Sequence, residues 1–300
     1  MNRYASIDIG SNTILLLIGE ITPQNTLQVV LESEETTRLG RGLQAGGRLD
    51  RHSVQKSIAV LKNYVSLCRQ KAAKEVVAVG TNALRLAGDA AEFLQLVKRE
   101  CHLLPQIIDA QQEAYFSYLA VEKDPMMPPD AFVIDVGGGS TEYTFPCIPF
   151  QAISLPLGAV RLTEEFLHGD PPAPDEVSRV QMQTEKHLDS LPAAIEEELV
   201  GIGGTAVTLG SIHLGHKEPN HNKIHGMKLS RREIRALTNR LLSVNLSARK
   251  NINGLPPARA DIMPAGAMII LASMERFKKK QIHISCRGLR YGLFYERFMS

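Results

Sequence analysis

A glycine-rich stretch between positions 132 and 142 carries the residue types that phosphate chemistry needs. Phe132 to Val136 is a β-branched and aromatic run with one acid, Asp135, near its end, which is typical of a buried strand. After it come three glycines, two hydroxyls and a second acid: Gly137, Gly138, Gly139, Ser140, Thr141 and Glu142. Glycines let backbone N–H groups approach a ligand closely, and carboxylates can hold Mg²⁺. The stretch therefore suits a phosphate cradled by amides, with a metal ion beside it.

A second stretch, at the start of the chain, repeats this order. An apolar strand leads to Asp8, and glycine, hydroxyl and amide donors follow it: Gly10, Ser11, Asn12 and Thr13. A further apolar strand, from Ile14 to Ile18, comes next. An ordinary glycine-rich hairpin would explain either copy alone, because short motifs match by chance. Two acid-tipped strand–turn–strand units instead predict two similar α/β domains that face one cleft.

A third strand-to-glycine turn lies in the second half of the chain. Leu199 to Ile202 is apolar, and three small residues join it to a helix predicted from Ala206 to Leu214: Gly203, Gly204 and Thr205. The strands expected around it cover about 132–136, 141–145, 151–155 and 282–285. Helices are predicted from Ala159 to Leu167, from Ile262 to Met274 as a central buried helix, and from Leu289 to Phe298.

Two charged residues of the first half are ambiguous. Arg85 lies in a helix that begins at Asn82, after a strand from Val76 to Val79, and open α/β sheets bind ligands at this end of a strand. Its position alone favours a solvated helix residue. Glu113 lies in the first turn of a helix that Asp109 caps, where glutamates commonly just complement the helix dipole.

Length and composition limit the other possibilities. Three hundred residues favour two domains, and the proline-rich break after Asp124 places the boundary between 1–123 and 124–300, with the last helix able to pack back on the first domain. A formal net charge of +2 neither favours nor excludes nucleic acid. No apolar run reaches membrane-spanning length, and no signal pattern opens the chain, so we expect a soluble, cytoplasmic protein.

The cysteines and histidines do not form a recognisable metal site. The four cysteines are scattered without a C-x-x-C pair, which argues against a thiolate zinc site or a disulfide framework and fits a reducing cytosol: Cys68, Cys101, Cys147 and Cys286. The segment 213–228 is rich in histidine and lysine, but the spacing of its four histidines matches no ligand pattern: His213, His216, His221 and His225. We expect a solvated or anion-facing loop there.

Together these residues resemble the exopolyphosphatase/guanosine pentaphosphate phosphohydrolase family, which belongs to the actin-like ATPases and sugar kinases. The resemblance covers nearly the whole chain. Its landmarks are the two phosphate loops, Thr81 to Arg85, Gln112 to Ala114, Gly201 to Thr205, His225-Gly226 and Gly288 to Gly292. Departures from the family pattern occur at Asn82, Gln112 and Tyr291, and Gln112 leaves Glu113 as the only acid in its motif.

The resemblance implies a fold and a mechanism. The fold would be two ribonuclease-H-like domains facing an interdomain cleft. Glu113 would orient or deprotonate the attacking water, and Arg85 would bind phosphate oxygens. Asp135 and Glu142 would hold Mg²⁺ or another divalent cation, with Glu142 also a catalytic candidate. The phosphate would be bound by the loops and the third turn: Asp8, Gly10, Ser11, Asn12, Thr13, Gly137, Gly138, Gly139, Ser140, Thr141, Gly203, Gly204 and Thr205.

The implied reaction releases orthophosphate from the end of linear polyphosphate or from guanosine pentaphosphate. The protein would be a monomer or a homodimer, with neither nucleic acid nor a membrane as a partner. A sugar or acid kinase would share the loops without needing Glu113 beside the terminal phosphate, and a chaperone-like ATPase would need a further domain. A non-catalytic alarmone- or polyphosphate-binding protein predicts binding without turnover and loss of the acids. Because Glu113, Asp135 and Glu142 are all present, we favour the hydrolase.

Overall fold

The computed structural model describes residues 2–146, 151–192, 195–217 and 220–299, so that Cys147 lies outside the described residues. The chain forms two compact units. Unit 1 comprises Met1–Ala120 together with Leu289–Ser300, and unit 2 comprises Val121–Gly288. The sequence of unit 2 is thus inserted into that of unit 1.

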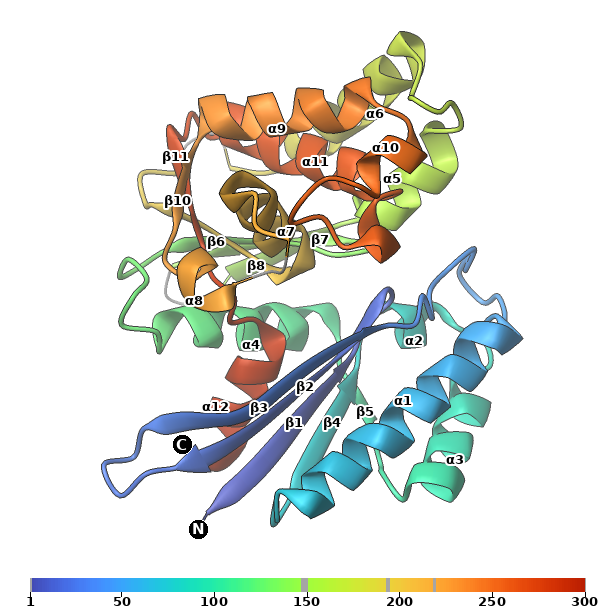
Figure 1. Cartoon of the computed structure of the whole chain (residues 1–300), viewed down its shortest axis with the longest axis vertical. Coiled ribbons are helices and arrows are strands. Elements are labelled where there is room, and N and C mark those ends of the chain that lie inside the picture. Colours follow the sequence, from blue (N-terminus) through green and yellow to red (C-terminus); the bar gives the residue numbers. More distant parts are fainter. Residues whose placement is uncertain (1, 147–150, 193–194, 218–219, 300) are drawn as a thin grey trace. The chain divides into compact units, whose positions relative to one another are not determined.

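Unit 1 is built on a five-stranded sheet with the strand order β3-β2-β1-β4-β5 (Figure 1). The first three strands are antiparallel neighbours, and β4 and β5 run parallel to β1. The strands are β1 (Arg3–Ile9), β2 (Thr13–Ile21), β3 (Leu27–Thr36), β4 (Val76–Gly80) and β5 (Gln106–Ile107). Strands β1, β4 and β5 therefore end at the same edge of the sheet, where open α/β sheets bind ligands.

Helices cover both faces of this sheet. Its helices are α1 (Arg51–Gln70), α2 (Asn82–Leu86), α3 (Ala90–Cys101), α4 (Ala110–Glu122, which runs into unit 2) and α12 (Leu289–Phe298). Alternate β1 residues such as Ile7 and Ile9 share a buried core with α1 and α3. On the other face, the Ser6 hydroxyl donates to the backbone oxygen of Arg290 in α12 at 2.6 Å, and Leu17 packs with Phe294. The helix predicted from Leu289 to Phe298 is confirmed.

Unit 2 repeats the sheet plan of unit 1. Its strand order is β10-β11-β9-β6-β7-β8, in which β6, β7 and β8 are antiparallel neighbours and β9 and β11 run parallel to β6. The strands are β6 (Phe132–Val136), β7 (Thr141–Phe145), β8 (Gln151–Leu155), β9 (Leu199–Ile202), β10 (Lys228–Ser230) and β11 (Gln281–Ile284). Without the extra edge strand β10, the order equals that of unit 1, as the duplicated glycine motif predicts.

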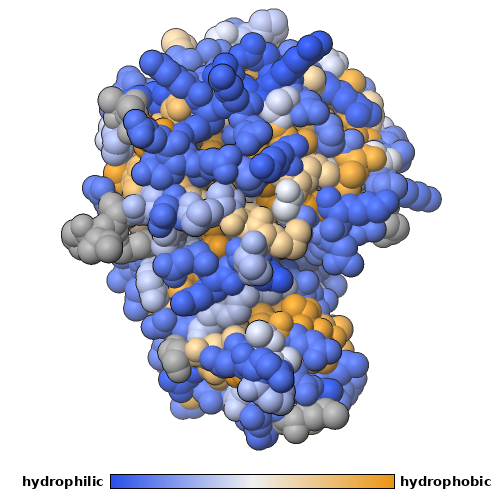
Figure 2. Space-filling view, turned by 90° about the vertical axis from the view of Figure 1, so that its left-hand side faces the viewer, coloured by the Kyte–Doolittle hydropathy of each residue, from blue (hydrophilic) through white to orange (hydrophobic). Residues whose placement is uncertain are grey.

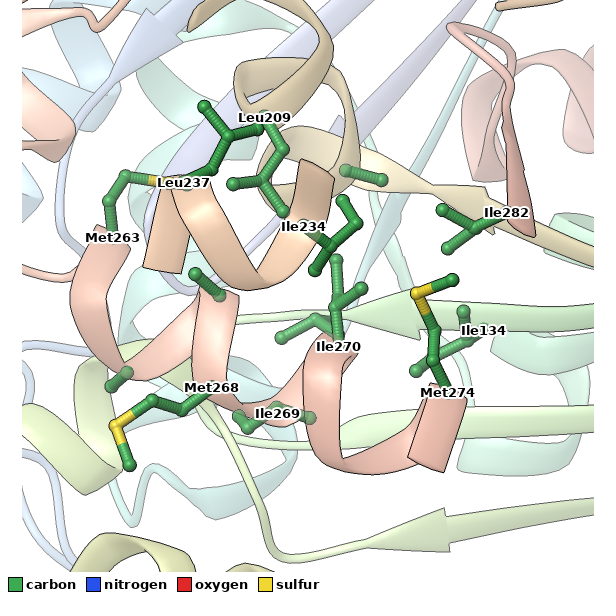
Figure 3. Packing of buried hydrophobic residues seen from close by; sticks show 14 of the residues in the cluster. Ile134, Leu209, Ile234, Leu237, Met263, Met268, Ile269, Ile270, Met274 and Ile282 are labelled. Atoms are coloured by element: carbon green, nitrogen blue, oxygen red, sulfur yellow. The ribbon is translucent and has the colours of Figure 1, made fainter. Parts of the chain in front are cut away.

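The core of unit 2 surrounds one apolar helix. Its helices are α5 (Ala159–Phe166), α6 (Pro174–Leu188), α7 (Gly203–Leu214), α8 (His221–Ile224), α9 (Arg231–Ser243), α10 (Leu246–Arg249) and α11 (Met263–Arg276). Figure 3 shows Ile270 and Met274 of α11 packed among side chains from the sheet and from α9. The predicted central buried helix is therefore confirmed.

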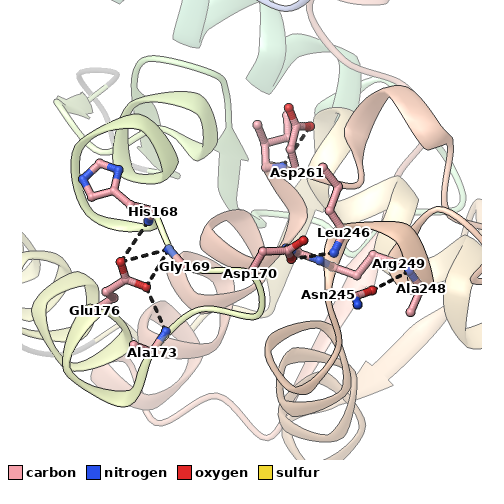
Figure 4. Close-up of polar contacts among 11 residues, drawn as sticks. His168, Gly169, Asp170, Ala173, Glu176, Asn245, Leu246, Ala248, Arg249 and Asp261 are labelled. Atoms are coloured by element: carbon pink, nitrogen blue, oxygen red, sulfur yellow. Dashed lines mark hydrogen bonds and ion pairs between the residues drawn. The ribbon is translucent and has the colours of Figure 1, made fainter.

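The connection between α5 and α6 is held by hydrogen bonds to two carboxylates (Figure 4). The Glu176 carboxylate accepts hydrogen bonds from the backbone N–H groups of His168, Gly169 and Ala173, at 2.8 to 3.1 Å. Beside it, Asp170 Oδ1 accepts from the Leu246 amide and lies 3.1 Å from the buried Arg249 guanidinium. These bonds fix the carboxyl-terminal end of α5, whose other end meets the second glycine hairpin.

In the described part of the chain, no helix has the length and hydrophobicity needed to span a membrane. The face drawn in Figure 2 is mostly hydrophilic, with smaller hydrophobic patches between the polar residues.

Candidate active site

Each sheet carries one tight glycine hairpin. In unit 1 the Gly10 amide donates to the Thr13 backbone oxygen at 3.0 Å, and in unit 2 the Gly137 amide donates to the Ser140 backbone oxygen at 2.9 Å. Both loops thus have a two-residue tip. The first glycine is needed sterically in each, because an added Cβ would lie only 2.9 Å from the Thr13 oxygen or 3.1 Å from the Ser140 oxygen.

Backbone carbonyls of both hairpin loops already accept hydrogen bonds. In unit 1, the Asn12 oxygen accepts from the amides of Thr37 and Arg38, and the Ser11 oxygen accepts from Gly40. In unit 2, the first residues of α5 donate to the carbonyls of Gly137 and Gly138 in the same way.

The backbone amides at the tips, in contrast, have no backbone acceptor among the described residues. Among the described residues, the N–H groups of Ser11, Asn12, Gly138 and Gly139 donate to no backbone carbonyl. Unbonded, adjacent backbone N–H groups form an anion-binding concavity. Both predicted phosphate loops therefore have the donors that a phosphate requires.

Two carboxylates stand beside the second hairpin. The register of β6 and β7 pairs Asp135 directly with Glu142, and directly opposed residues have Cβ atoms about 4.5–5.5 Å apart. Among the described residues, no group of three or more histidine, cysteine, aspartate and glutamate side chains could hold a metal ion. Mg²⁺ commonly uses only one or two carboxylates and takes its other ligands from water and phosphate. The oxygen-only pair of Asp135 and Glu142 therefore fits magnesium.

The third glycine turn adjoins this pair. Helix α7 begins at Gly203, whose φ of +73° favours glycine, and an added Cβ there would overlap the Asp135 carboxylate. The Thr205 hydroxyl donates to the Val136 backbone oxygen at 2.9 Å and ties α7 to β6. The predicted strand-to-glycine turn therefore lies against the end of β6.

Arg259 is a candidate that sequence reasoning missed. It is buried, and its guanidinium lies where a side chain on Gly204 would be. A cation at the N-terminal end of α7 suits the binding of an anion. Arg259 follows a proline-rich turn without any helical or strand period, so the sequence offered no signal that separates it from a solvated arginine.

In unit 1, Arg85 and Glu113 form a close ion pair. Arg85 follows β4 and Glu113 follows β5, and the Arg85 Nη1 atom lies 2.6 Å from Glu113 Oε2 and 3.0 Å from the Ile108 backbone oxygen. Their side chains are only 20% and 14% exposed. The interpretation of Arg85 as a solvated helix residue is therefore wrong, because the backbone oxygen after β5 and the Glu113 carboxylate draw it inward.

The environment of Glu113 suits proton transfer. Burial raises the pKa of its carboxyl group, and the neighbouring Arg85 guanidinium opposes this rise by favouring the carboxylate. A base whose pKa is raised toward the working pH can accept a proton and release it again. A glutamate that only complemented the helix dipole would need neither burial nor an arginine beside it.

Each unit gathers its candidates at the carboxyl edge of its own sheet. In unit 1, Thr81 donates its amide to the Ile9 oxygen and Ile108 donates to the Gly80 oxygen, so the ends of β1, β4 and β5 adjoin. The first hairpin, Arg85 and Glu113 are the groups at this edge. In unit 2, the second hairpin, the carboxylate pair and the third turn are brought together in the same way.

The histidine-rich segment differs from the expected loop. Residues 221–224 form the short helix α8, and His225 is mostly buried. Its Nδ1 accepts from the Cys286 amide at 3.2 Å, and its Nε2 lies 2.9 Å from Oδ2 of Asp124, whose side chain is fully buried. Burial alone would raise the pKa of Asp124, but His225, the Met126 amide and Arg287 lower it below its usual value. Of the two expected settings, a solvated or an anion-facing loop, the solvated one is wrong for His225, because this side chain pairs with a buried acid.

Comparison with known proteins identifies the family of this chain. The model of the Ppx/GppA phosphatase family matches residues 17–300. The chain is 29% identical over 284 residues to exopolyphosphatase 2 of Mycobacterium tuberculosis, covering 90% of this chain and 89% of that protein. It is 36% identical to the solved Aquifex aeolicus PPX-GPPA enzyme, with a TM-score of 0.84 and 99% of each chain covered.

An exopolyphosphatase from Cytophaga hutchinsonii is 24% identical, with a TM-score of 0.86 over 98% of this chain and 97% of that one, and it supports the fold alone. The two sheets and these neighbours give the chain the two-domain α/β fold of the actin-like ATPases. With a family match that spans most of its length, the chain belongs to the Ppx/GppA phosphatase family.

Proposed function

We propose that this protein is a phosphohydrolase that removes the terminal orthophosphate from linear polyphosphate or from guanosine pentaphosphate. The observation that carries the proposal is the juxtaposition in unit 2 of an anion cradle and a carboxylate pair. The amides of Gly138 and Gly139 have no carbonyl acceptor among the described residues, and Asp135 pairs with Glu142 on the two strands that this hairpin joins. An anion site and a cation site side by side suit a substrate that carries a phosphate anhydride.

The reaction is the attack of water on the terminal phosphorus atom. The water oxygen forms a new bond to phosphorus, and the bond from phosphorus to the bridging oxygen breaks. The bridging oxygen leaves with the electron pair on a chain that is one phosphate shorter. Glu113 accepts the proton that the water loses, and Arg85 binds oxygens of the phosphoryl group while holding Glu113 in place.

The amide cradles of both hairpins would bind phosphate oxygens, together with the third turn and Arg259. A divalent cation bound by Asp135 and Glu142 would neutralise charge on the phosphates. The remaining work belongs to the chain itself, which positions the phosphate, orients the water and accepts a proton. Positioning and charge neutralisation account for most of the catalysis of phosphoryl transfer.

Turnover separates the hydrolase from a non-catalytic binding protein and from a kinase. We would measure orthophosphate release from polyphosphate and from guanosine pentaphosphate, with Mg²⁺ and with a chelator. The proposal expects release from at least one substrate with Mg²⁺ and its loss with chelator. Tight binding without release would support the binding protein, and transfer to a small-molecule acceptor without release to water would support a kinase.

A further inference from the structure

One hydroxyl outside the predicted motifs extends the carboxylate pair across the sheet. Strands β6 and β7 pair Asp135 with Glu142, and strands β7 and β8 pair Glu142 with Ser154. The three side chains therefore form one row on one face of the sheet. The Ser154 hydroxyl donates a hydrogen bond to Glu142 Oε1 at 2.8 Å.

Each carboxylate of the row has a neighbour on the side that faces away from the other carboxylate. Glu142 is almost completely buried, at 4% exposed, and Ser154 on the edge strand occupies its Oε1. Asp135 is bounded on its other side by Gly203, where an added Cβ would overlap it. A hydrogen bond to an ionised carboxylate is stronger than one between neutral groups. The Ser154 bond thus favours one orientation of the Glu142 carboxylate.

We propose that Ser154 is a positioning residue, which orients Glu142 so that it and Asp135 can share one divalent cation. This inference rests on the proposed function, because it assumes that the carboxylate pair holds the cation. Partners that hydrogen-bond to a metal-binding side chain fix its orientation, and their loss typically weakens metal binding by about 10–100-fold. A purely structural hydroxyl would satisfy a buried acid and change stability without changing the affinity for metal.

Three variants separate these roles. Ser154→Ala removes the donor, and Ser154→Thr keeps a hydroxyl on an exposed strand position that accepts β-branched residues. Ser178→Ala is the matched control, because the exposed Ser178 hydroxyl donates only to the Pro174 backbone oxygen of its own helix. Each purified protein is titrated with Mn²⁺ by electron paramagnetic resonance and with Mg²⁺ in the turnover assay.

We expect Ser154→Ala to bind Mn²⁺ and to require Mg²⁺ at concentrations about tenfold higher than wild type, while kcat at saturating Mg²⁺ stays close to wild type. Ser154→Thr should restore most of the affinity, and Ser178→Ala should match wild type. Wild-type metal affinity in Ser154→Ala would overturn the inference and leave the proposed function intact. A wild-type protein that binds no Mn²⁺ and hydrolyses its substrate in chelator would overturn both the cation site and the role of Ser154.

Discussion

The two glycine hairpins have the same backbone and different side chains. Each has a two-residue tip closed by an amide-to-carbonyl bond from a glycine, at Gly10 and at Gly137. In each, backbone carbonyls of the loop accept amide hydrogen bonds from a neighbouring segment, and a glycine lies against the tip, Gly40 in unit 1 and Gly158 in unit 2. The acids Asp8 and Asp135 precede the two loops at equivalent positions.

The residue opposite the acid distinguishes the hairpins. Asp8 is paired with Leu15, whereas Asp135 is paired with Glu142. The hairpin backbone with its unbonded amides is therefore common to both units, whereas the directly opposed pair of carboxylates occurs at the second hairpin. The second acid of unit 1 is Glu113, which lies on another element beside Arg85. The two units thus share a hairpin backbone and differ in the acidic side chains that accompany it.

The largest effect should follow removal of the base from unit 1. Glu113→Gln keeps the size of the side chain but cannot accept a proton, and a positioned base contributes about 10²–10⁴-fold to turnover. We expect kcat to fall by this factor while polyphosphate binding and the melting temperature stay near those of wild type. The control is Glu122→Gln, an exposed glutamate on the same helix. Full activity in Glu113→Gln would move the search for the base to Glu142.

A direct test of the comparison is the same substitution at the two equivalent aspartates. Asp135→Asn removes half of the carboxylate pair, so it should raise the Mg²⁺ requirement and lower turnover by roughly 10²-fold through misplacement of the phosphate. Asp8→Asn has no second carboxylate opposite it and should leave the Mg²⁺ requirement nearly unchanged. Turnover measured over a range of Mg²⁺ concentrations checks both. Equal shifts in the two variants would contradict the assignment of the cation to the carboxylate pair of unit 2.

The Arg85–Glu113 pair predicts a change in the pH dependence. Arg85 lowers the pKa of Glu113 and burial raises it, so removing Arg85 leaves the effect of burial unopposed. In Arg85→Ala the acidic limb of the kcat/KM profile should therefore move to higher pH, and turnover at neutral pH should fall about tenfold. Arg85→Lys should recover only part of the loss, because it lacks the planar guanidinium. An unchanged acidic limb would mean that Glu113 is not the group that accepts the proton.

The smallest expected effects concern the glycines behind the tips. Gly158 has φ −138°, which suits any residue, so Gly158→Ala acts only through the overlap of its Cβ with the Gly138 backbone. Overpacking of this kind costs about 1–3 kcal/mol. At Gly40 the added Cβ would meet the Ser11 side chain at 2.9 Å, and Ser11 is less rigidly fixed than a backbone. Urea unfolding should show a larger loss of unfolding free energy for Gly158→Ala than for Gly40→Ala. The reverse order would contradict the steric argument.

Local signals predicted much of this structure from the sequence. The three strands 132–136, 141–145 and 151–155 are confirmed to the residue, because turn-forming residues such as the glycines set their limits. Ser230 and Glu233, with the spacing of a capping box, begin α9 in this way. Helix α3 was missed although Phe93, Val97 and Cys101 repeat at a helical period on its buried side.

The features of the candidate site that the sequence did not predict depend on contacts between residues far apart in the chain. Arg85 is turned inward by the Ile108 carbonyl and by Glu113, and neither follows from the helix that carries Arg85. Arg259 meets Gly204, and Ser154 meets Glu142 only through the register of β7 and β8. Strand register is a tertiary property, so a pattern within one segment cannot reveal which side chains it places together.

The insertion of unit 2 into unit 1 has a consequence for synthesis on the ribosome. Domains of a nascent chain usually fold in the order in which they are made, from the N-terminus. Here α12 covers the face of β1 and β2, where Gly19 lies so close to Phe294 that an added Cβ would be 2.9 Å from its ring. The part of this face that α12 covers therefore stays uncovered until every residue of unit 2 has been translated. We expect unit 2 to be complete first, and the domain that begins the chain to be the last to mature.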